Sequence, residues 1–438
     1  MAHTVLSRTP SGAGNRKTYT ISLWVKRSQL GSQNILYSVN GGTNNTNYME
    51  MAFNGIDNLN IGGYTSNFLV TTAKFRDTAA WYHIVWRVDT TQSTADDRFR
   101  LYVNGVQETA FSTRNNPGQN DDTAANMAAS TQVGSTLEGY ISQYIMADGQ
   151  SYAPTVFGST NANGIWIPNS QPSVTYGTNG FKLDFAGTGA SADASGFGAD
   201  SSGNNNHFAS SNLGTNPSTT DTCINNFATF NPLDTRQSAT FSLGNMKVVT
   251  SSSNRNYVTP TQAFASGKWY MECRFTAGAS SGYVGFCDMS NLQMTGTSTL
   301  GDLPNEARVN NDGSYEKNNS TTSGWAGSFT DNDILGLALD CDNNRFTLSK
   351  NGQWADGSGN YDEANPTAYI TYTTGNFMSF AFGEGAGGAT ATIEINTGNA
   401  PYTISSGNAD GAGYGSFEYA VPSGYYALCT KNLGAYGG

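Results

Sequence analysis

The sequence predicts an all-β protein made of two antiparallel β-sandwich domains joined by a loop segment rich in Gly and Asn. Two alternating strands begin with Trp-Tyr, at Trp81 and Trp269, and each is followed by a strand that ends in an Asn-Gly turn, at Asn104-Gly105 and Asn351-Gly352. Alternating strands with Asn-Gly turns are the strongest short-range signal for β-hairpins. The composition agrees, because 12% aromatic residues, 13% charged residues and 51 glycines are typical of short strands joined by many turns.

Residues 1–150 are expected to form the first sandwich. The runs 19–27, 81–89, 98–104 and 139–147 alternate between apolar and other side chains. Successive side chains of a strand point to opposite faces, so a period of two predicts strands that bury one face. No helical period is sustained in this part of the chain, and one half-buried sandwich accounts for it.

Residues 151–235 read as a connector. Gly, Ser and Asn dominate, as in the run 200–206, and aromatic residues such as Phe157, Trp166 and Phe227 are sparse. A structureless loop of this length inside a compact domain would be unusual. We therefore expect its aromatic side chains to dock onto a neighbouring domain.

Residues 236–438 resume the strand pattern and predict the second sandwich. The runs 283–287, 334–339 and 377–382 are almost wholly apolar, as in buried strands. The spacing between the Trp-Tyr start and the Asn-Gly turn differs between the two halves, so they are not a sequence repeat.

Charge and targeting signals exclude several classes. The net charge is -11 and no Lys/Arg cluster could follow a phosphate backbone, so no nucleic-acid partner is expected. The first residues lack a charged segment followed by an apolar one, and no apolar run approaches the ~18 residues of a membrane span. We expect synthesis in a host cytoplasm without a signal peptide and no membrane insertion.

The five cysteines form no C-x-x-C pair, which disfavours structural zinc. Buried free thiols are the simpler expectation, and pairing between two of them stays open.

The first domain resembles the laminin-G/concanavalin-A-like jelly-roll group, which includes lectin-like and pentraxin-like modules. The resemblance is carried by 81–85, by Asp89 at the end of that strand, and by 101–105. It implies a jelly roll for residues 1–150.

The second domain resembles a SPRY domain. Four motifs, at 267–272, 284–286, 333–340 and 346–352, occur in the order expected for that family. They imply a SPRY-like β-sandwich for residues 236–438.

Residues 5–235 also resemble tail-fibre and capsid-fibre proteins of bacteriophages, particularly marine ones. The motifs that carry this resemblance are Ser7–Ser11, Gly14–Arg16, Asp148–Gln150, Gly164–Trp166, Tyr176–Phe181 and Asp200–Asn204. The resemblance implies a virion structural protein whose partners are other capsid or tail proteins. It also explains the absence of a signal peptide, because phage proteins leave the cell by lysis.

Catalysis is not expected. A glycanase needs two carboxylates facing each other across a cleft. Asp340 and Asp342 fall at a turn, and five glutamates are isolated from other carboxylates at the required spacing: Glu50, Glu108, Glu138, Glu272 and Glu394. A nucleophilic triad needs a histidine beside Ser or Cys, and His83 lies within a strand, where a surface or interlayer role is the simpler interpretation.

Calcium is the one cofactor that the jelly-roll resemblance suggests. Jelly-roll lectins of this class often bind Ca²⁺ through Asp, Asn and carbonyl oxygens. The candidate ligands are Asp89, Asp96, Asp97, Asp121 and Asp122, with Asn120 beside them and Asp200 and Asn204 in the connector. The alternative is a set of solvated acidic loops.

Glycan binding would use exposed aromatic rings on which sugars stack. The candidates in loop-like positions are Tyr48, Tyr64, Trp325 and Trp354, although each could instead be a packing residue.

Together these features predict a non-enzymatic phage virion protein, either a capsid fibre or decoration protein or a tail fibre. Its lectin-like modules would attach to host-surface glycan, and as a homo-oligomer it would gain avidity from many weak contacts. The alternatives are a capsid-cementing protein without a ligand and a virion-associated glycan depolymerase.

Overall fold

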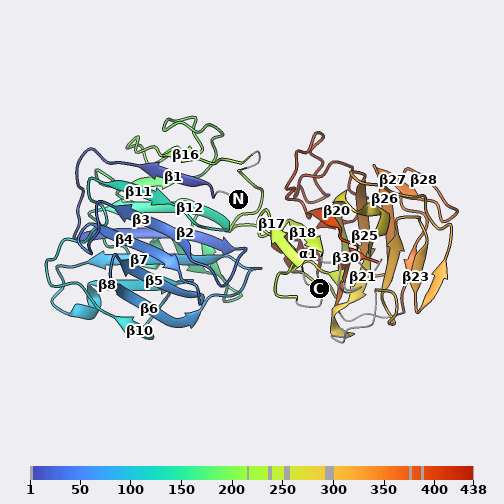
Figure 1. Ribbon diagram of the computed structural model, residues 1–438, viewed down its shortest axis with the longest axis horizontal. Coiled ribbons are helices and arrows are strands. Elements are labelled where there is room, and N and C mark those ends of the chain that lie inside the picture. The colour runs from blue at the N-terminus through green and yellow to red at the C-terminus, as the bar shows by residue number, and fades with distance from the viewer. Residues whose placement is uncertain are drawn as a thin grey trace. The chain divides into compact units, whose positions relative to one another are not determined.

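The computed structural model divides the chain into two compact units, shown in Figure 1. Unit 1 comprises residues 1–218 with 222–224, and unit 2 comprises 219–221 with 225–438. The regular secondary structure of both is nearly all β-strand, arranged in mainly antiparallel sheets, which confirms the predicted fold class. The structure describes residues 3–214, 217–234, 239–250, 257–291, 300–373, 377–385 and 389–437.

Unit 1 contains two main antiparallel sheets. The eight-stranded sheet has the order β10 (Phe111–Arg114), β6 (Asn67–Lys74), β5 (Asn58–Gly63), β4 (Tyr48–Phe53), β3 (Asn34–Asn40), β11 (Ser130–Val133), β1 (Val5–Arg8) and β16 (Ala209–Ser211). The six-stranded sheet has the order β15 (Phe181–Leu183), β12 (Gly139–Asp148), β2 (Thr18–Arg27), β7 (Tyr82–Asp89), β8 (Phe99–Val103) and β9 (Val106–Gln107). A separate hairpin pairs β13 (Gly158–Thr160) with β14 (Trp166–Pro168).

The core of unit 1 follows the alternation in the sequence. Ile21, Leu23 and Val25 of β2 are fully buried in the main core cluster, where Trp86 meets Tyr19 edge to face with ring centroids 5.5 Å apart. The opposite face of β2 is buried too. The Tyr152 N–H donates to Thr20 Oγ1 at 2.8 Å on this face, and Phe157 packs on the neighbouring strands. The strand pattern predicts sheets that bury only one face, but β2 in the six-stranded sheet is buried on both faces.

The predicted connector divides between the two units. Phe157 packs in a second cluster of unit 1, and Phe181 and Phe208 enter its main core with ring centroids 4.7 Å apart. Phe227 and Phe230 are buried among residues of unit 2. The division between the units lies at residues 218–225, because Phe157, Phe181 and Phe208 are buried in unit 1, and Phe227 and Phe230 in unit 2.

Unit 2 also contains two sheets. One has the order β17 (Ala239–Ser242), β18 (Lys247–Thr250), β31 (Thr392–Asn396), β20 (Lys268–Ala277), β25 (Ile334–Asp340), β26 (Arg345–Lys350), β27 (Gln353–Ala355) and β28 (Tyr361–Glu363), with β29 (Ile370–Thr371) on β26 and β32 (Tyr426–Ala427) parallel to β20. The other has the order β19 (Tyr257–Val258), β30 (Met378–Glu384), β21 (Gly282–Asp288), β22 (Ala307–Asn310), β23 (Tyr315–Lys317) and β24 (Ser320–Thr322).

Both predicted Asn-Gly turns are present. Asn104 and Gly105 have φ of 49° and 80°, and Asn351 and Gly352 have 49° and 83°, as a type I′ turn requires at its two central residues. They join β8 to β9 and β26 to β27.

Helical structure is sparse in the described part of the chain. It consists of α1 (Thr430–Tyr436) and four single 3₁₀ turns, η1 (Ala95–Asp97), η2 (Pro154–Val156), η3 (Ala279–Ser281) and η4 (Met289–Asn291). Among the described residues, no helix has the length and apolar character needed to cross a membrane.

Candidate functional site

A row of small and polar residues crosses the outer face of the eight-stranded sheet in unit 1. Cross-strand pairing places its members side by side on six neighbouring strands: Ser7, Gln132, Ser38, Glu50, Gly62 and Asn67. Their neighbours along the strands, such as Leu6, Met49 and Ile61, are buried in the core. Because side chains alternate between the two faces of a sheet, this polar row points away from the core.

Glu50 occupies the middle of the polar row. Its side chain accepts two hydrogen bonds, one from Gln33 Nε2 to Oε1 at 2.8 Å and one from the Tyr48 hydroxyl to Oε2 at 2.5 Å. Burial, the hydrogen bond and the charge of Glu50 all raise the pKa of Tyr48 above its usual value. The arrangement follows from the alternation in β4, where Tyr48 and Glu50 face outward and Met49 faces the core.

Gly62 lies beside Glu50 in the polar row and is buried. A Cβ atom at this position would lie 3.2 Å from Glu50 Cγ, from Asn60 Nδ2 and from Asn67 Oδ1. Such contacts are tighter than ordinary van der Waals packing, so the three side chains surround the glycine closely. Carboxylate and amide groups therefore converge around the backbone of Gly62, which is itself buried.

Two tyrosines stand at one end of this arrangement. The rings of Tyr48 and Tyr64 meet edge to face, with centroids 6.1 Å apart and an interplanar angle of 76°. Tyr64 is 51% exposed. Its loop is held by Asn45, which accepts from the Thr65 N–H at 2.8 Å and donates to Ser66 Oγ at 2.9 Å. The polar row thus has an exposed, fixed aromatic side chain beside it.

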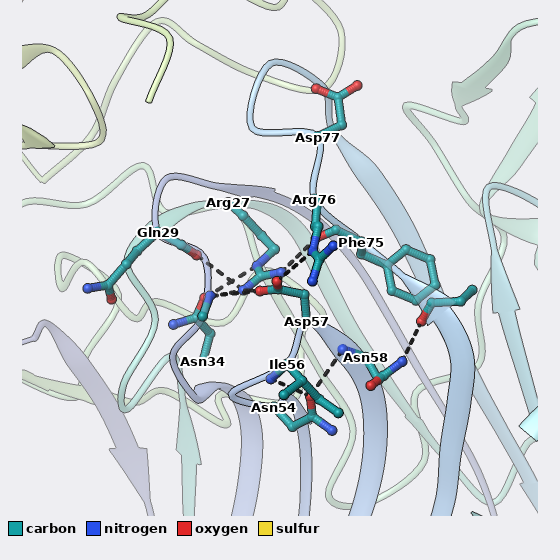
Figure 2. Close-up of polar contacts among 12 residues, drawn as sticks. Arg27, Gln29, Asn34, Asn54, Ile56, Asp57, Asn58, Phe75, Arg76 and Asp77 are labelled. Atoms are coloured by element: carbon teal, nitrogen blue, oxygen red, sulfur yellow. Dashed lines mark hydrogen bonds and ion pairs between the residues drawn. The ribbon is translucent and has the colours of Figure 1, made fainter. Parts of the chain in front are cut away.

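The β4–β5 turn fixes the register between Glu50 and Gly62. Figure 2 shows the Asp57 carboxylate between Arg27, whose Nη2 lies 3.1 Å from Oδ1, and Arg76, whose Nε lies 2.9 Å from Oδ2. Burial alone would raise the pKa of Asp57, but hydrogen bonds from the Gly31 N–H and Arg76 and the charge of Arg27 outweigh it and lower that pKa. The Arg27 side chain is fully buried, so this ion pair is an internal support for the hairpin.

Two of the four predicted stacking residues lie elsewhere. Trp325 is 6% exposed and meets Tyr315 edge to face, and Trp354 is 4% exposed and packs against Tyr270. Both are packing residues of unit 2, and neither presents a ring face to a ligand. Only Tyr48 and Tyr64 are brought together.

The predicted calcium ligands form ion pairs and hydrogen bonds with other residues of the protein. Asp96 pairs with Arg114 at 2.8 Å and Asp97 with Arg100 at 2.5 Å. Asp89 and Asp121 each accept a hydrogen bond from a backbone N–H of their own loop. Asp122 lies 4.0 Å from the ammonium group of Lys17. Within the described ranges, no three His, Cys, Asp or Glu side chains come together as a metal site would require. The geometry therefore gives the calcium prediction no support.

Four of the fibre-like motifs, those at 14–16, 148–150, 176–181 and 200–204, contribute polar contacts that hold loops of unit 1 together. Asp148 accepts from the N–H groups of Asn15 at 2.7 Å and Asn179 at 3.0 Å. The Asn204 amide donates to two backbone carbonyls at 2.7 and 3.0 Å, and Asp200 accepts from the backbone N–H of Lys182. Asp200 and Asn204 thus hydrogen-bond to neighbouring loops.

His83 is fixed in a form that cannot act as a base toward its neighbouring serine. The Trp166 indole donates to Nδ1 at 2.9 Å, and Ser22 Oγ lies 2.9 Å from Nε2. An indole N–H only donates, so Nδ1 is unprotonated and Nε2 carries the hydrogen that Ser22 accepts. Burial lowers the pKa of His83 to about 3. The residue lies between the six-stranded sheet and the β13–β14 hairpin, in an interlayer position.

The sequence reasoning missed most of the polar row. It treated Glu50 as an isolated carboxylate and did not single out Gln33, Ser38, Asn67 or Gln132. The alternation of Tyr48 and Glu50 with Met49 and Met51 was the available signal, because it places a tyrosine and a carboxylate on one exposed strand face.

Residues 5–156 match the sequence family described as the Concanavalin A-like lectin/glucanases superfamily. They form a concanavalin A-like domain, as the first resemblance implied. No curated protein matches the chain.

Solved structures similar to this chain include three with low sequence identity and low TM-scores. The PSpry domain of TRIM65 has 17% identity, a TM-score of 0.30 and coverage of 39% of this chain and 91% of that one. The SPRY domain of human HERC1 has 14% identity, a TM-score of 0.29 and coverage of 38% of this chain and 96% of that one. A Bacteroides ovatus protein described as carbohydrate-binding has 15% identity, a TM-score of 0.31 and coverage of 48% of this chain and 55% of that one. The SPRY-like interpretation of residues 236–438 stays a prediction.

Proposed function

We propose that this protein binds glycans through the polar row and the Tyr48–Tyr64 pair of unit 1. The observation that carries the proposal is the convergence of Glu50, Asn60 and Asn67 over Gly62 beside an exposed tyrosine. Carboxylate and amide groups pair with sugar hydroxyls, while an aromatic ring supplies apolar contact area for the sugar face. The concanavalin A-like domain in residues 5–156 supports the same function.

The proposed activity is binding without catalysis. The polar row contains one carboxylate, Glu50, whereas glycoside hydrolysis by the usual mechanisms uses two that flank the scissile bond. His83 Nε2 donates its hydrogen to Ser22 Oγ, and His83 Nδ1 accepts the hydrogen of the Trp166 indole. These side chains therefore do not form an activated nucleophile.

We further propose that the protein is a phage virion component, a capsid fibre or decoration protein or a tail fibre, made in the host cytoplasm. The fibre-like motifs of residues 5–235 support this assignment. Other virion proteins would anchor it, and a homo-oligomer would present several copies of the polar row to the host surface. Linked weak sites bind with much higher avidity than single sites.

Glycan arrays with the full chain test the binding function. Tyr64→Ala is expected to weaken binding at least tenfold, which corresponds to about 1.4 kcal/mol, because it removes the exposed ring. Tyr436→Ala in unit 2, where the tyrosine is 40% exposed, is the matched control and should bind normally. Failure of the wild-type chain to bind any glycan, or equal binding by Tyr64→Ala, would contradict the proposal.

Labelled-antibody localisation on intact particles tests the virion assignment. Label at the tail or on projecting fibres supports host attachment, and label spread over the capsid lattice supports capsid display or cementing. Absence from the particle contradicts the assignment while leaving the array result untouched.

A further inference from the structure

We infer that the polar row selects neutral oligosaccharides and rejects anionic ones, such as uronate-containing or sialylated chains. This inference rests on the proposed glycan-binding function and adds the chemical class of the ligand. The charge at the centre of the row and the positions of the cations around it both favour neutral ligands.

Glu50 is the one charged member of the polar row, and it has no cationic partner there. Its two hydrogen-bond donors, Gln33 and Tyr48, are both neutral. The other members offer hydroxyl or amide groups, except Gly62, which has no side chain. A ligand lying across the row therefore meets a single negative charge that no neighbouring member offsets.

Three arginines on nearby segments are held by partners outside the row; the acceptors of Arg8 and Arg16 are neutral and fix these side chains without cancelling their charge. Arg8 at the end of β1 donates to Asn206 Oδ1, and Arg16 donates to the carbonyl oxygens of Thr123 and Thr46 at 2.7 and 3.0 Å. Arg114 of the edge strand β10 pairs with Asp96 at 2.8 Å.

Lys74 lies at the far end of β6. Its cross-strand partner is Asn58, four positions along β5 from Gly62, so the lysine backbone is roughly 13 Å from the row at the usual rise per residue. That separation exceeds the Debye length of about 8 Å at physiological ionic strength. Lys74 therefore does little to attract an anionic group to the centre of the row.

The neutral members suit sugar hydroxyls. Gln132 and Asn67 each carry an amide that donates and accepts, and Ser7 and Ser38 carry hydroxyls that do both. A hydroxyl is also both donor and acceptor, so it can pair with any of them. A carboxylate or sulfate only accepts, and it would meet the accepting oxygens of Glu50 with like charge.

The repulsion between Glu50 and an anionic ligand is large enough to measure as a loss of affinity. Two like unit charges about 4 Å apart repel by about 1 kcal/mol in bulk water and more at lower effective dielectric, which is a factor of about five or more in affinity. Glu50 is 8% exposed, so solvent screens it less than a surface carboxylate. We therefore expect anionic ligands to bind at least about fivefold more weakly than matched neutral ones.

Matched oligosaccharide pairs test the inference. The probes are a galactose-terminated oligosaccharide with its sialylated counterpart, and a xylo-oligosaccharide with its glucuronate-substituted counterpart. The wild-type chain should prefer the neutral member of any pair it binds by about fivefold or more. Glu50→Gln removes the charge but keeps the shape, and it should reduce the preference toward one.

The matched control is Asp193→Asn, which removes an exposed carboxylate of a distant loop in unit 1 and should leave the preference unchanged. Raising salt from 50 to 500 mM should shrink the wild-type preference, because ions screen the repulsion, and this readout needs no variant. Equal or tighter binding of the anionic members by the wild type overturns the inference alone. Absence of binding to all glycans overturns the proposed function instead.

Discussion

Acidification is expected to destabilise unit 1 through His83. The imidazole is wholly buried, stacks against Trp24 with ring centroids 4.7 Å apart, and accepts the Trp166 N–H at Nδ1. Protonating the ring would place two donors face to face at Nδ1 and would bury a charge. The native fold therefore requires the neutral ring.

The sign and size of the effect follow from the two pKa values. Burial lowers the pKa of folded His83 to about 3, whereas the unfolded chain titrates at the usual value of about 6.5. Between these values the unfolded state binds the additional proton, so stability is full above about pH 6.5 and falls as the pH drops toward 3. From pH 7 to pH 4.5 the loss from this one group is about 2.5 kcal/mol.

Denaturant unfolding of the full chain at several pH values measures this loss, with His83→Gln as the reference. The free energy of unfolding of the wild type should fall by about 2.5 kcal/mol more than that of the variant between pH 7 and 4.5. Tryptophan fluorescence reports on both units, because the seven tryptophans divide between unit 1 (Trp24, Trp81, Trp86, Trp166) and unit 2 (Trp269, Trp325, Trp354). The comparison with His83→Gln isolates the contribution of His83 in unit 1. A difference between the two proteins that does not change with pH would refute the reasoning.

Three further predictions concern buried polar groups. Arg27→Ala should lower the free energy of unfolding by about 3 kcal/mol in denaturant titration, because it removes a buried cation that pairs with the buried Asp57 carboxylate. Arg76→Ala, which removes a 53% exposed side chain, should lower it by less than about 1 kcal/mol. Burial raises the pKa of Glu306 to about 7, so folded unit 2 should lose about 2.5 kcal/mol as the pH rises from 5 to 8, and Glu306→Gln should abolish that slope. Asp148→Asn should cost about 2 kcal/mol by the same titration, since it weakens charge-assisted hydrogen bonds to neighbouring loops.

Local sequence rules predicted the strands and turns of both units well. The alternation of Ile21, Leu23 and Val25 gave the buried face of β2, and the Asn-Gly pairs gave two turns with positive φ at both central residues. These features depend on residues close in sequence, for which propensity and periodicity carry the information.

The candidate site could not be predicted in the same way. Its members come from positions 7 to 132 and meet only through the register of six strands, which a single sequence does not determine. Trp325 and Trp354 looked like loop aromatics, yet each is buried by contacts with distant segments. The opposite face of β2 is covered by residues 151–176, whose docking likewise depends on tertiary contacts.

The most direct test of the account is a crystal structure of the full chain with a neutral oligosaccharide that it binds. The account predicts a sugar ring against Tyr64 and sugar hydroxyls within hydrogen-bond distance of Glu50 and Asn67, over Gly62. An oligosaccharide bound at the loops of Asp89 to Asp122, or on unit 2, with the polar row unoccupied, would contradict it.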